Sequence, residues 1–150
     1  MTIDEQDELP DEIFDQIADL SEDGEDLFEN GDFEEAIAKW NDALALLPEP
    51  KIKWDAALWL YTALGDGYRN IGDFDKALVA FNEAYESVDG STNPYVLYSI
   101  GATLYDLDRK DESVVPLLKA YEMEGDEIFE EEGEVYLTFL DEKGLLDDPE

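Results

Sequence analysis

Apolar residues recur every three or four positions along most of the chain, which is the period of an amphipathic helix. The pattern predicts helices over about 10–30, 33–47, 51–71, 75–87, from 94 to at least 104, 110–123 and 126–143. Pro10 and Pro94 suit the first turn of a helix, where no backbone donor is needed. Pro116 falls about one turn into the sixth helix, so we expect a distorted start there. The chain is therefore predicted to be all-α.

One set of spacings occurs three times in the sequence. A glycine is followed, at fixed distances, by a small residue and then by a large one. The three sets are Gly24, Ala36 and Trp40; Gly65, Ala77 and Phe81; and Gly101, Ser113 and Leu117. Small residues allow two helices to approach closely, and a recurring unit of this kind predicts stacked helix pairs that share one continuous core.

These spacings, with Gly31 and Gly72 at the turns, resemble the tetratricopeptide repeat over about 17–126. The resemblance implies a helical-hairpin solenoid of three repeats plus a C-terminal capping helix, about seven helices in all, over 10–143. Residues 1–9 then form an acidic N-terminal tail and 144–150 a C-terminal tail. The distance from Gly24 to Gly65 exceeds the family's repeat of about 34 residues by roughly two helical turns. We expect these extra residues to lengthen the third helix.

The charge of the chain is extreme, with 42 Asp and Glu against 9 Lys and Arg and a formal net charge of -33. Such a field favours a cationic partner and disfavours direct contact with nucleic acid or an anionic membrane. The N-terminal residues are acidic and lack the apolar run of a signal peptide. No apolar stretch approaches the length of a membrane span. We therefore expect a cytoplasmic protein.

The residues that most enzymes rely on are missing from this sequence. It contains no His and no Cys, so the commonest general base and the thiol nucleophile are both absent. No phosphate-binding glycine loop or nucleophile elbow occurs. Residues 106–112 have only a faint likeness to a calcium loop, because the central Gly is missing and the last Glu comes too early. We predict a non-enzymatic protein with no catalytic residue, metal site or cofactor.

The resemblance also implies where a partner binds, namely in a concave groove lined by the first helix of each pair. The candidates are the residues of those helices, and of the last helix, that lie outside the apolar stripe. They are Glu25, Phe28, Glu29, Trp59, Thr62, Asp66, Arg69, Tyr95, Tyr98, Tyr105, Glu131, Glu134 and Thr138, with Ser21 and Ala102 beside them. Aromatic anchors interleaved with carboxylates suit a basic, partly apolar protein or peptide. The alternative is that the aromatic residues only cover neighbouring helices.

Family members that grip acidic chaperone tails use basic groove residues. Glu25, Asp66 and Ala102 stand at the corresponding places here, with Arg69 the one base, so that ligand class is disfavoured. The leading hypothesis is an inhibitor or immunity protein that masks a cationic toxin, nuclease or effector. A secretion chaperone for an effector segment is the alternative. A scaffold or adaptor whose acidity serves mainly solubility, as in a salt-adapted organism, is a third possibility, and a homodimer through the first or seventh helix is a further one.

Overall fold

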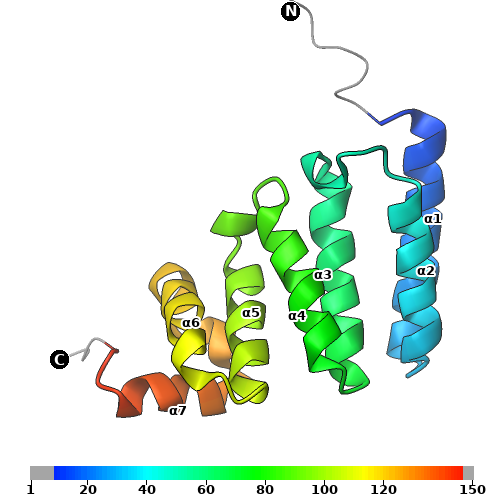
Figure 1. The fold of residues 1–150 in the computed structure, drawn as a ribbon. Coiled ribbons are helices and arrows are strands. Elements are labelled where there is room, and N and C mark those ends of the chain that lie inside the picture. Colours follow the sequence, from blue (N-terminus) through cyan, green and yellow to red (C-terminus); the bar gives the residue numbers. More distant parts are fainter. Residues whose placement is uncertain (1–8, 147–150) are drawn as a thin grey trace, which may run out of the picture.

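The computed structural model describes residues 9–146 and shows a stack of helices with no strand in that range (Figure 1). The expected all-α repeat solenoid is confirmed. Three antiparallel pairs are followed by a last helix. The α-helices are α1 (Asp11–Glu29), α2 (Phe33–Ala45), α3 (Asp55–Asn70), α4 (Phe74–Glu86), α5 (Pro94–Asp106), α6 (Lys110–Glu124) and α7 (Glu134–Glu142), and the short 3-10 helices are η2 (Lys51–Lys53), η3 (Gly90–Thr92) and η4 (Gly125–Phe129).

The repeated glycines are where the two helices of a pair come closest. A Cβ atom added at Gly24 would overlap the indole of Trp40, and one added at Gly65 would overlap the ring of Phe81. Both rings are almost fully buried. The glycine therefore leaves room for the large residue of the partner helix, which is the close approach that the sequence pattern predicts.

The connection between the first two pairs differs from the expected one. Residues 51–53 form η2 rather than the start of α3. The Nζ of Lys51 donates to the carbonyl oxygens of Leu44 and Leu47 at 2.9 and 3.1 Å, and so caps the end of α2. Trp54 is extended and buried, and its indole donates to the Pro48 carbonyl at 2.8 Å. Residues 51–54 thus form a packed connection, and the predicted start of the third helix at Lys51 was wrong. The third helix begins at Asp55 and has 16 residues against 13 in α5, so it is lengthened by less than the expected two turns.

The C-terminal part corrects two further expectations. A single helix over 126–143 was wrong, because Glu131 has a φ of 69° and η4 is separated from α7 by a turn. Phe129 at the end of η4 is buried, which holds this segment against α5 and α6. Pro116 lies in the middle of α6, which runs without a break from Lys110, so the expected distorted start is not found.

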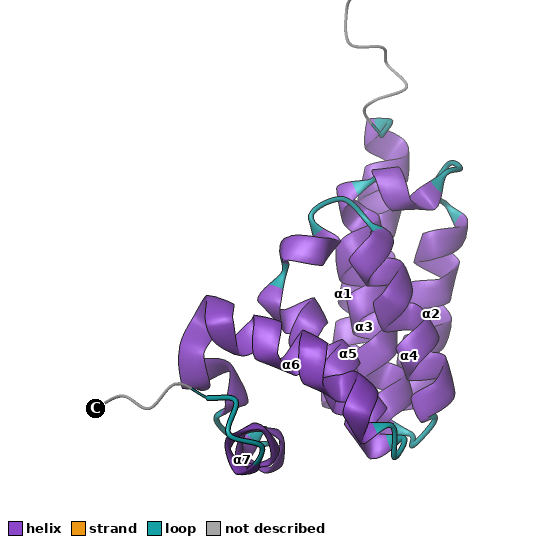
Figure 2. Cartoon of the chain, turned by 60° about the vertical axis from the view of Figure 1, so that its left-hand side comes forward, coloured by secondary structure: helices purple, strands orange, loops and turns teal. Residues whose placement is uncertain are grey.

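The last helix lies across the end of the stack. Figure 2 shows α7 nearly end-on, whereas the helices of the first two pairs stand upright. Its buried residues, Tyr136 and Leu140, share a core cluster with Leu117 and Phe129. It therefore covers the third pair, as the expected capping helix would. Of the two predicted tails, residues 1–8 and 147–150 lie outside the described residues. Within 9–146, no helix is both long enough and apolar enough to cross a membrane.

Candidate functional site

A pocket of about 320 Å³ opens among the first helices of the pairs. We call the side formed by α1, α3 and α5 the first-helix face. The side chains that line the pocket come from that face and from the segment around α7. They are Phe28, Asp66, Arg69, Asn70, Tyr95, Tyr98, Ser99, Ala102, Glu132 and Tyr136. Residues far apart in the sequence thus converge on one hollow.

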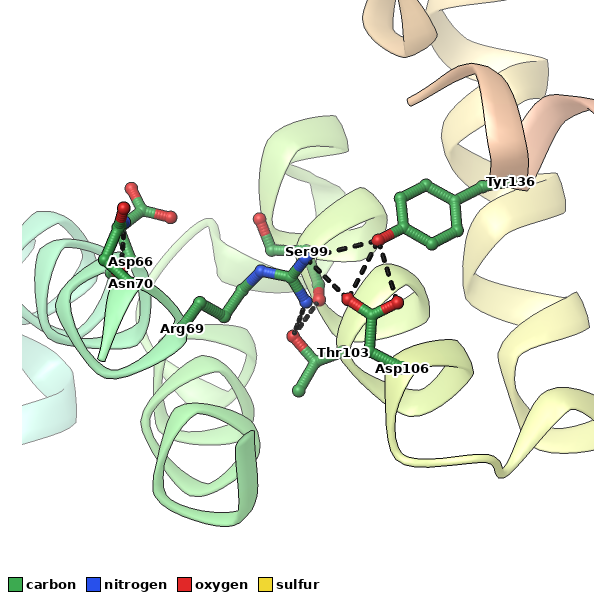
Figure 3. Close-up of polar contacts among 7 residues, drawn as sticks. All are labelled: Asp66, Arg69, Asn70, Ser99, Thr103, Asp106 and Tyr136. Carbon is green, nitrogen blue, oxygen red and sulfur yellow. Dashed lines mark hydrogen bonds and ion pairs between the residues drawn. The ribbon is translucent and has the colours of Figure 1, made fainter. Parts of the chain in front are cut away.

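Helical spacing explains why α3 and α5 supply most of this lining. Asp66, Arg69 and Asn70 are three and four positions apart, and they therefore lie on one face of α3. Tyr95, Tyr98, Ser99 and Ala102 follow the same rule on α5. Figure 3 shows Asp66, Arg69 and Asn70 on α3 and Ser99 on the neighbouring helix.

Asp66 is a half-buried carboxylate at the centre of the pocket lining. It accepts a hydrogen bond from the Tyr95 hydroxyl, with 2.8 Å between Tyr95 Oη and Asp66 Oδ1. Burial raises the pKa of the Asp66 carboxyl to about 6, against the lowering effects of Tyr95 and Arg69 and with a further rise from Glu132. Burial also raises the pKa of the Tyr95 hydroxyl. The pair therefore keeps a proton on Tyr95 and a costly charge on Asp66 at neutral pH.

Arg69 lies in the pocket wall, but its guanidinium already forms an ion pair with Asp106. Its Nη2 is 2.8 Å from Asp106 Oδ2 and 3.2 Å from the Tyr136 hydroxyl, and its Nη1 donates to Thr103 Oγ1 at 3.0 Å. The Tyr136 hydroxyl donates to Asp106 in turn, at 2.9 Å. Burial raises the pKa of Tyr136 to about 12. This network, drawn in Figure 3, joins α3, α5 and α7.

The aromatic residues of the site pack edge to face with one another. The ring centroid of Tyr98 is 5.4 Å from that of Phe129 and 5.9 Å from that of Tyr136. Phe28 rests on Phe33 at 5.1 Å. Tyr95 is 42% exposed, so a large part of its ring is open to solvent. These rings therefore fix the walls of the pocket while part of their surface stays accessible.

The structure brings together some of the predicted partner-binding residues and separates the others from the pocket. Phe28, Asp66, Arg69, Tyr95 and Tyr98 line it, as does Ala102. Tyr105 packs instead between Tyr136 and Phe139, and the Thr62 hydroxyl donates to the Leu58 carbonyl of its own helix. The remaining predicted residues are exposed outside the pocket lining; they are Glu25, Glu29, Trp59, Glu131, Glu134 and Thr138.

Four lining residues were missed at the sequence level. Asn70 and Ser99 lie four positions after Asp66 and Tyr95, so their helical spacing could have identified them. Glu132 belongs to an acidic run over 130–134, and nothing in that run singles out one carboxylate. Nothing in the sequence indicates that the Tyr136 hydroxyl reaches Arg69 and Asp106.

A larger hollow, of about 450 Å³, lies between α2, α3 and α4. Its walls are mainly apolar, and Lys76 and Glu83 give it both signs of charge. A similar hollow of about 270 Å³ lies one pair later, between α4, α5 and α6. Because they recur at successive joins, these hollows are explained by the stacking itself. No group of three or more His, Cys, Asp or Glu placed to hold a metal ion is found within 9–146.

The comparisons with known proteins agree with the helix-pair architecture. Residues 22–90 match a family model described as the tetratricopeptide repeat; the match runs from the C-terminal part of α1 through the end of α4. None of the curated proteins searched matches the chain. Tetratricopeptide repeats build protein-interaction modules and are generally non-enzymatic. Residues 22–90 therefore belong to the tetratricopeptide repeat family, and α5 and α6 continue the same stack of helix pairs.

Proposed function

We propose that this chain binds a basic protein or peptide on its first-helix face and masks it, as an inhibitor or immunity-type protein does. The observation that carries the proposal is the pocket with Asp66 and Glu132 in its aromatic lining. Neither carboxylate forms an ion pair within residues 9–146, and Arg69 is paired with Asp106. A cationic group can therefore enter without breaking an existing ion pair.

The distribution of charge along the chain supports a directed role. About half of the residues of α1 are acidic and none is basic, and the segment 122–134 is similarly acidic without a base. Phe28 and Glu132, one from each of these two regions, both line the pocket. A protein whose acidity served only solubility would have its acids spread evenly. The clustering of acids in two regions that each contribute a residue to the pocket lining favours electrostatic steering of a cationic partner.

Binding of a labelled peptide that alternates Arg and Leu tests this function. Fluorescence anisotropy should show tight binding at low salt and weaker binding at moderate salt. Glu29→Gln combined with Glu132→Gln should weaken it by about tenfold, whereas Asp42→Asn combined with Glu86→Gln removes the same charge from α2 and α4 and should change it by less than about twofold.

Two outcomes would count against the proposal. Equal losses in both double variants would mean that the peptide senses only net charge. If the peptide did not bind even at low salt, the proposal of a basic partner would be wrong. A pull-down from the source cell, eluted with salt, then separates the roles: a basic nuclease or toxin supports masking, and an apolar secreted effector supports the alternative of a secretion chaperone.

A further inference from the structure

In the part of the chain that the structure describes, the charged residues of the pocket lining leave negative charge without a counterion. Asp66 and Glu132 contribute two carboxylates, and the one base in the lining, Arg69, has its guanidinium bound by Asp106, Thr103 and Tyr136. Asp66 Oδ1 accepts from Tyr95, while no hydrogen bond or ion pair within 9–146 engages Oδ2. The pocket therefore presents acceptor oxygens and no uncommitted cation.

Four aromatic rings surround these acceptors. Phe28, Tyr95, Tyr98 and Tyr136 all contribute to the lining, and a volume of about 320 Å³ exceeds what one long side chain needs. The ring faces of Tyr and Phe attract cations through their quadrupoles, most strongly where water is partly excluded. Contacts of Tyr98 with Phe129 and Tyr136 hold its ring in place without a ligand, so little ordering is needed when a ligand enters.

We infer that this pocket is a receptor for a single cationic side chain, an arginine or lysine of the bound partner. The inference rests on the proposed function, since it names the group that the first-helix face recognises. The side chain enters alongside Tyr95 and Tyr98, whose rings pack against each other with centroids 6.3 Å apart, and its guanidinium or ammonium group donates to Asp66 and lies near Glu132. Arginine suits the site best, because its plane stacks on an aromatic ring while its edge donates to a carboxylate.

An NMR titration of the full chain with N-acetyl-arginine-amide tests the receptor. Saturable shifts are expected at Tyr95, Tyr98 and Asp66. N-acetyl-citrulline-amide, which has nearly the same shape and no charge, should bind at least about tenfold more weakly. Asp66→Asn should weaken arginine binding by a similar factor, while Asp42→Asn, with the same change of charge on exposed α2, should leave it unchanged. Circular dichroism checks that each variant is folded.

A pair of variants at one position separates stacking from charge. Tyr95→Phe keeps the ring and should retain most of the affinity, whereas Tyr95→Leu should lose several-fold. Shifts spread over all acidic surfaces without saturation, or citrulline binding as well as arginine, would overturn the receptor. Equal affinity for agmatine and for a peptide with one arginine would point to a free small cation instead of a partner side chain, and would overturn that part of the inference.

The two proposals fail in different ways. If the Arg–Leu peptide binds the first-helix face but the single arginine does not occupy the pocket, the receptor falls and the proposed function stands. If the single arginine binds the pocket but the Arg–Leu peptide binds no more tightly than it does, the receptor stands and the wider first-helix face falls as the docking surface.

Discussion

The carboxyl group of Asp66 is half-buried between α3 and α5, and a charge there is costly. Its pKa of about 6 lies above the value of about 3.9 that an unfolded Asp has. The folded state therefore binds the proton more tightly than the unfolded state. The protonated carboxyl contributes full stability below about pH 4, and this contribution is lost as the pH rises through about 6.

Asp66→Asn should accordingly stabilise the fold at neutral pH while it weakens cation binding. The amide keeps an acceptor for Tyr95 and carries no charge, so we expect a gain of about 1–2 kcal/mol in the free energy of unfolding near pH 7.5, and little gain near pH 4. Urea denaturation at both pH values measures it. If the free energy of unfolding rose equally at both pH values, or fell at pH 7.5, the charge of Asp66 would not destabilise the folded state.

The same carboxyl makes cation binding depend on pH. The groups that face it are Tyr95, Arg69 and Glu132. Of these, Tyr95 has its pKa raised and stays protonated at neutral pH. We expect the affinity for N-acetyl-arginine-amide to be flat above about pH 7 and to fall by up to about tenfold per pH unit below about 6. Titrations with N-acetyl-arginine-amide across this pH range measure the affinity of the unchanged protein and of Asp66→Asn. If both proteins showed the same dependence on pH, Asp66 would not be the group that controls binding.

Arg69 acts inside the molecule, and its removal should be felt as lost stability. Arg69→Met leaves Asp106 without its ion pair and Thr103 without a donor, which should cost about 1–3 kcal/mol, allowing for partial exposure of the pair. A double-mutant cycle with Asp106→Asn measures the coupling. If the two single changes simply add, the network does not join α3 to α5 as the distances indicate.

At the scale of elements, the helix pairs themselves could be predicted from the sequence. Their apolar period and the glycine opposite each large residue are local patterns. The connections after α2 and after α6 were predicted wrongly. The short helix η2 depends on the bond from Lys51 to the end of α2 and on the burial of Trp54 in the core. The short helix η4 depends on the contact of Phe129 with Tyr98. Such contacts join residues of different helices, and periodicity within one segment carries no information on them.

The candidate site divides along the same line. The sequence correctly placed Asp66, Tyr95 and Tyr98 on one face, because helical spacing alone decides that. It could not show that Arg69 was already paired, because Asp106 lies on another helix 37 positions away. The packing of Tyr105 outside the pocket could not be predicted for a related reason, since its packing partners belong to α7, whose start was predicted too early.

The packing of each repeated glycine against a large residue of the partner helix allows a prediction at this scale. Ala is a better helix former than Gly by about 1 kcal/mol, so Gly65→Ala would stabilise α3 if nothing opposed it. Because its Cβ would overlap the Phe81 ring, we expect a net loss of about 1–3 kcal/mol instead. Adding Phe81→Leu should recover part of it. A stabilised Gly65→Ala protein in thermal melts would contradict the close approach of α3 and α4.

For the whole molecule, a net charge of -33 opposes compaction, because few bases are present to pair the acids. Of the ion pairs seen within residues 9–146, two join residues three positions apart on one segment, and Arg69–Asp106 joins two helices. Repulsion should be greatest at the two acidic regions, α1 and 122–134. Added salt screens such repulsion over about a Debye length of 10 Å.

We therefore expect the melting temperature to rise between low and moderate NaCl, by roughly 3–8 °C if screening gains about 1–2 kcal/mol. Replacing exposed acids of α1, as in Asp15→Asn with Asp19→Asn, should raise it at low salt and reduce the further gain from salt. Asp42→Asn with Glu86→Gln, outside both acidic regions, should do so less. A midpoint that is unchanged or falls with salt would contradict the repulsion. Equal effects of the two double variants would show instead that the acids act as one diffuse charge, without the clustering on which steering toward the first-helix face depends.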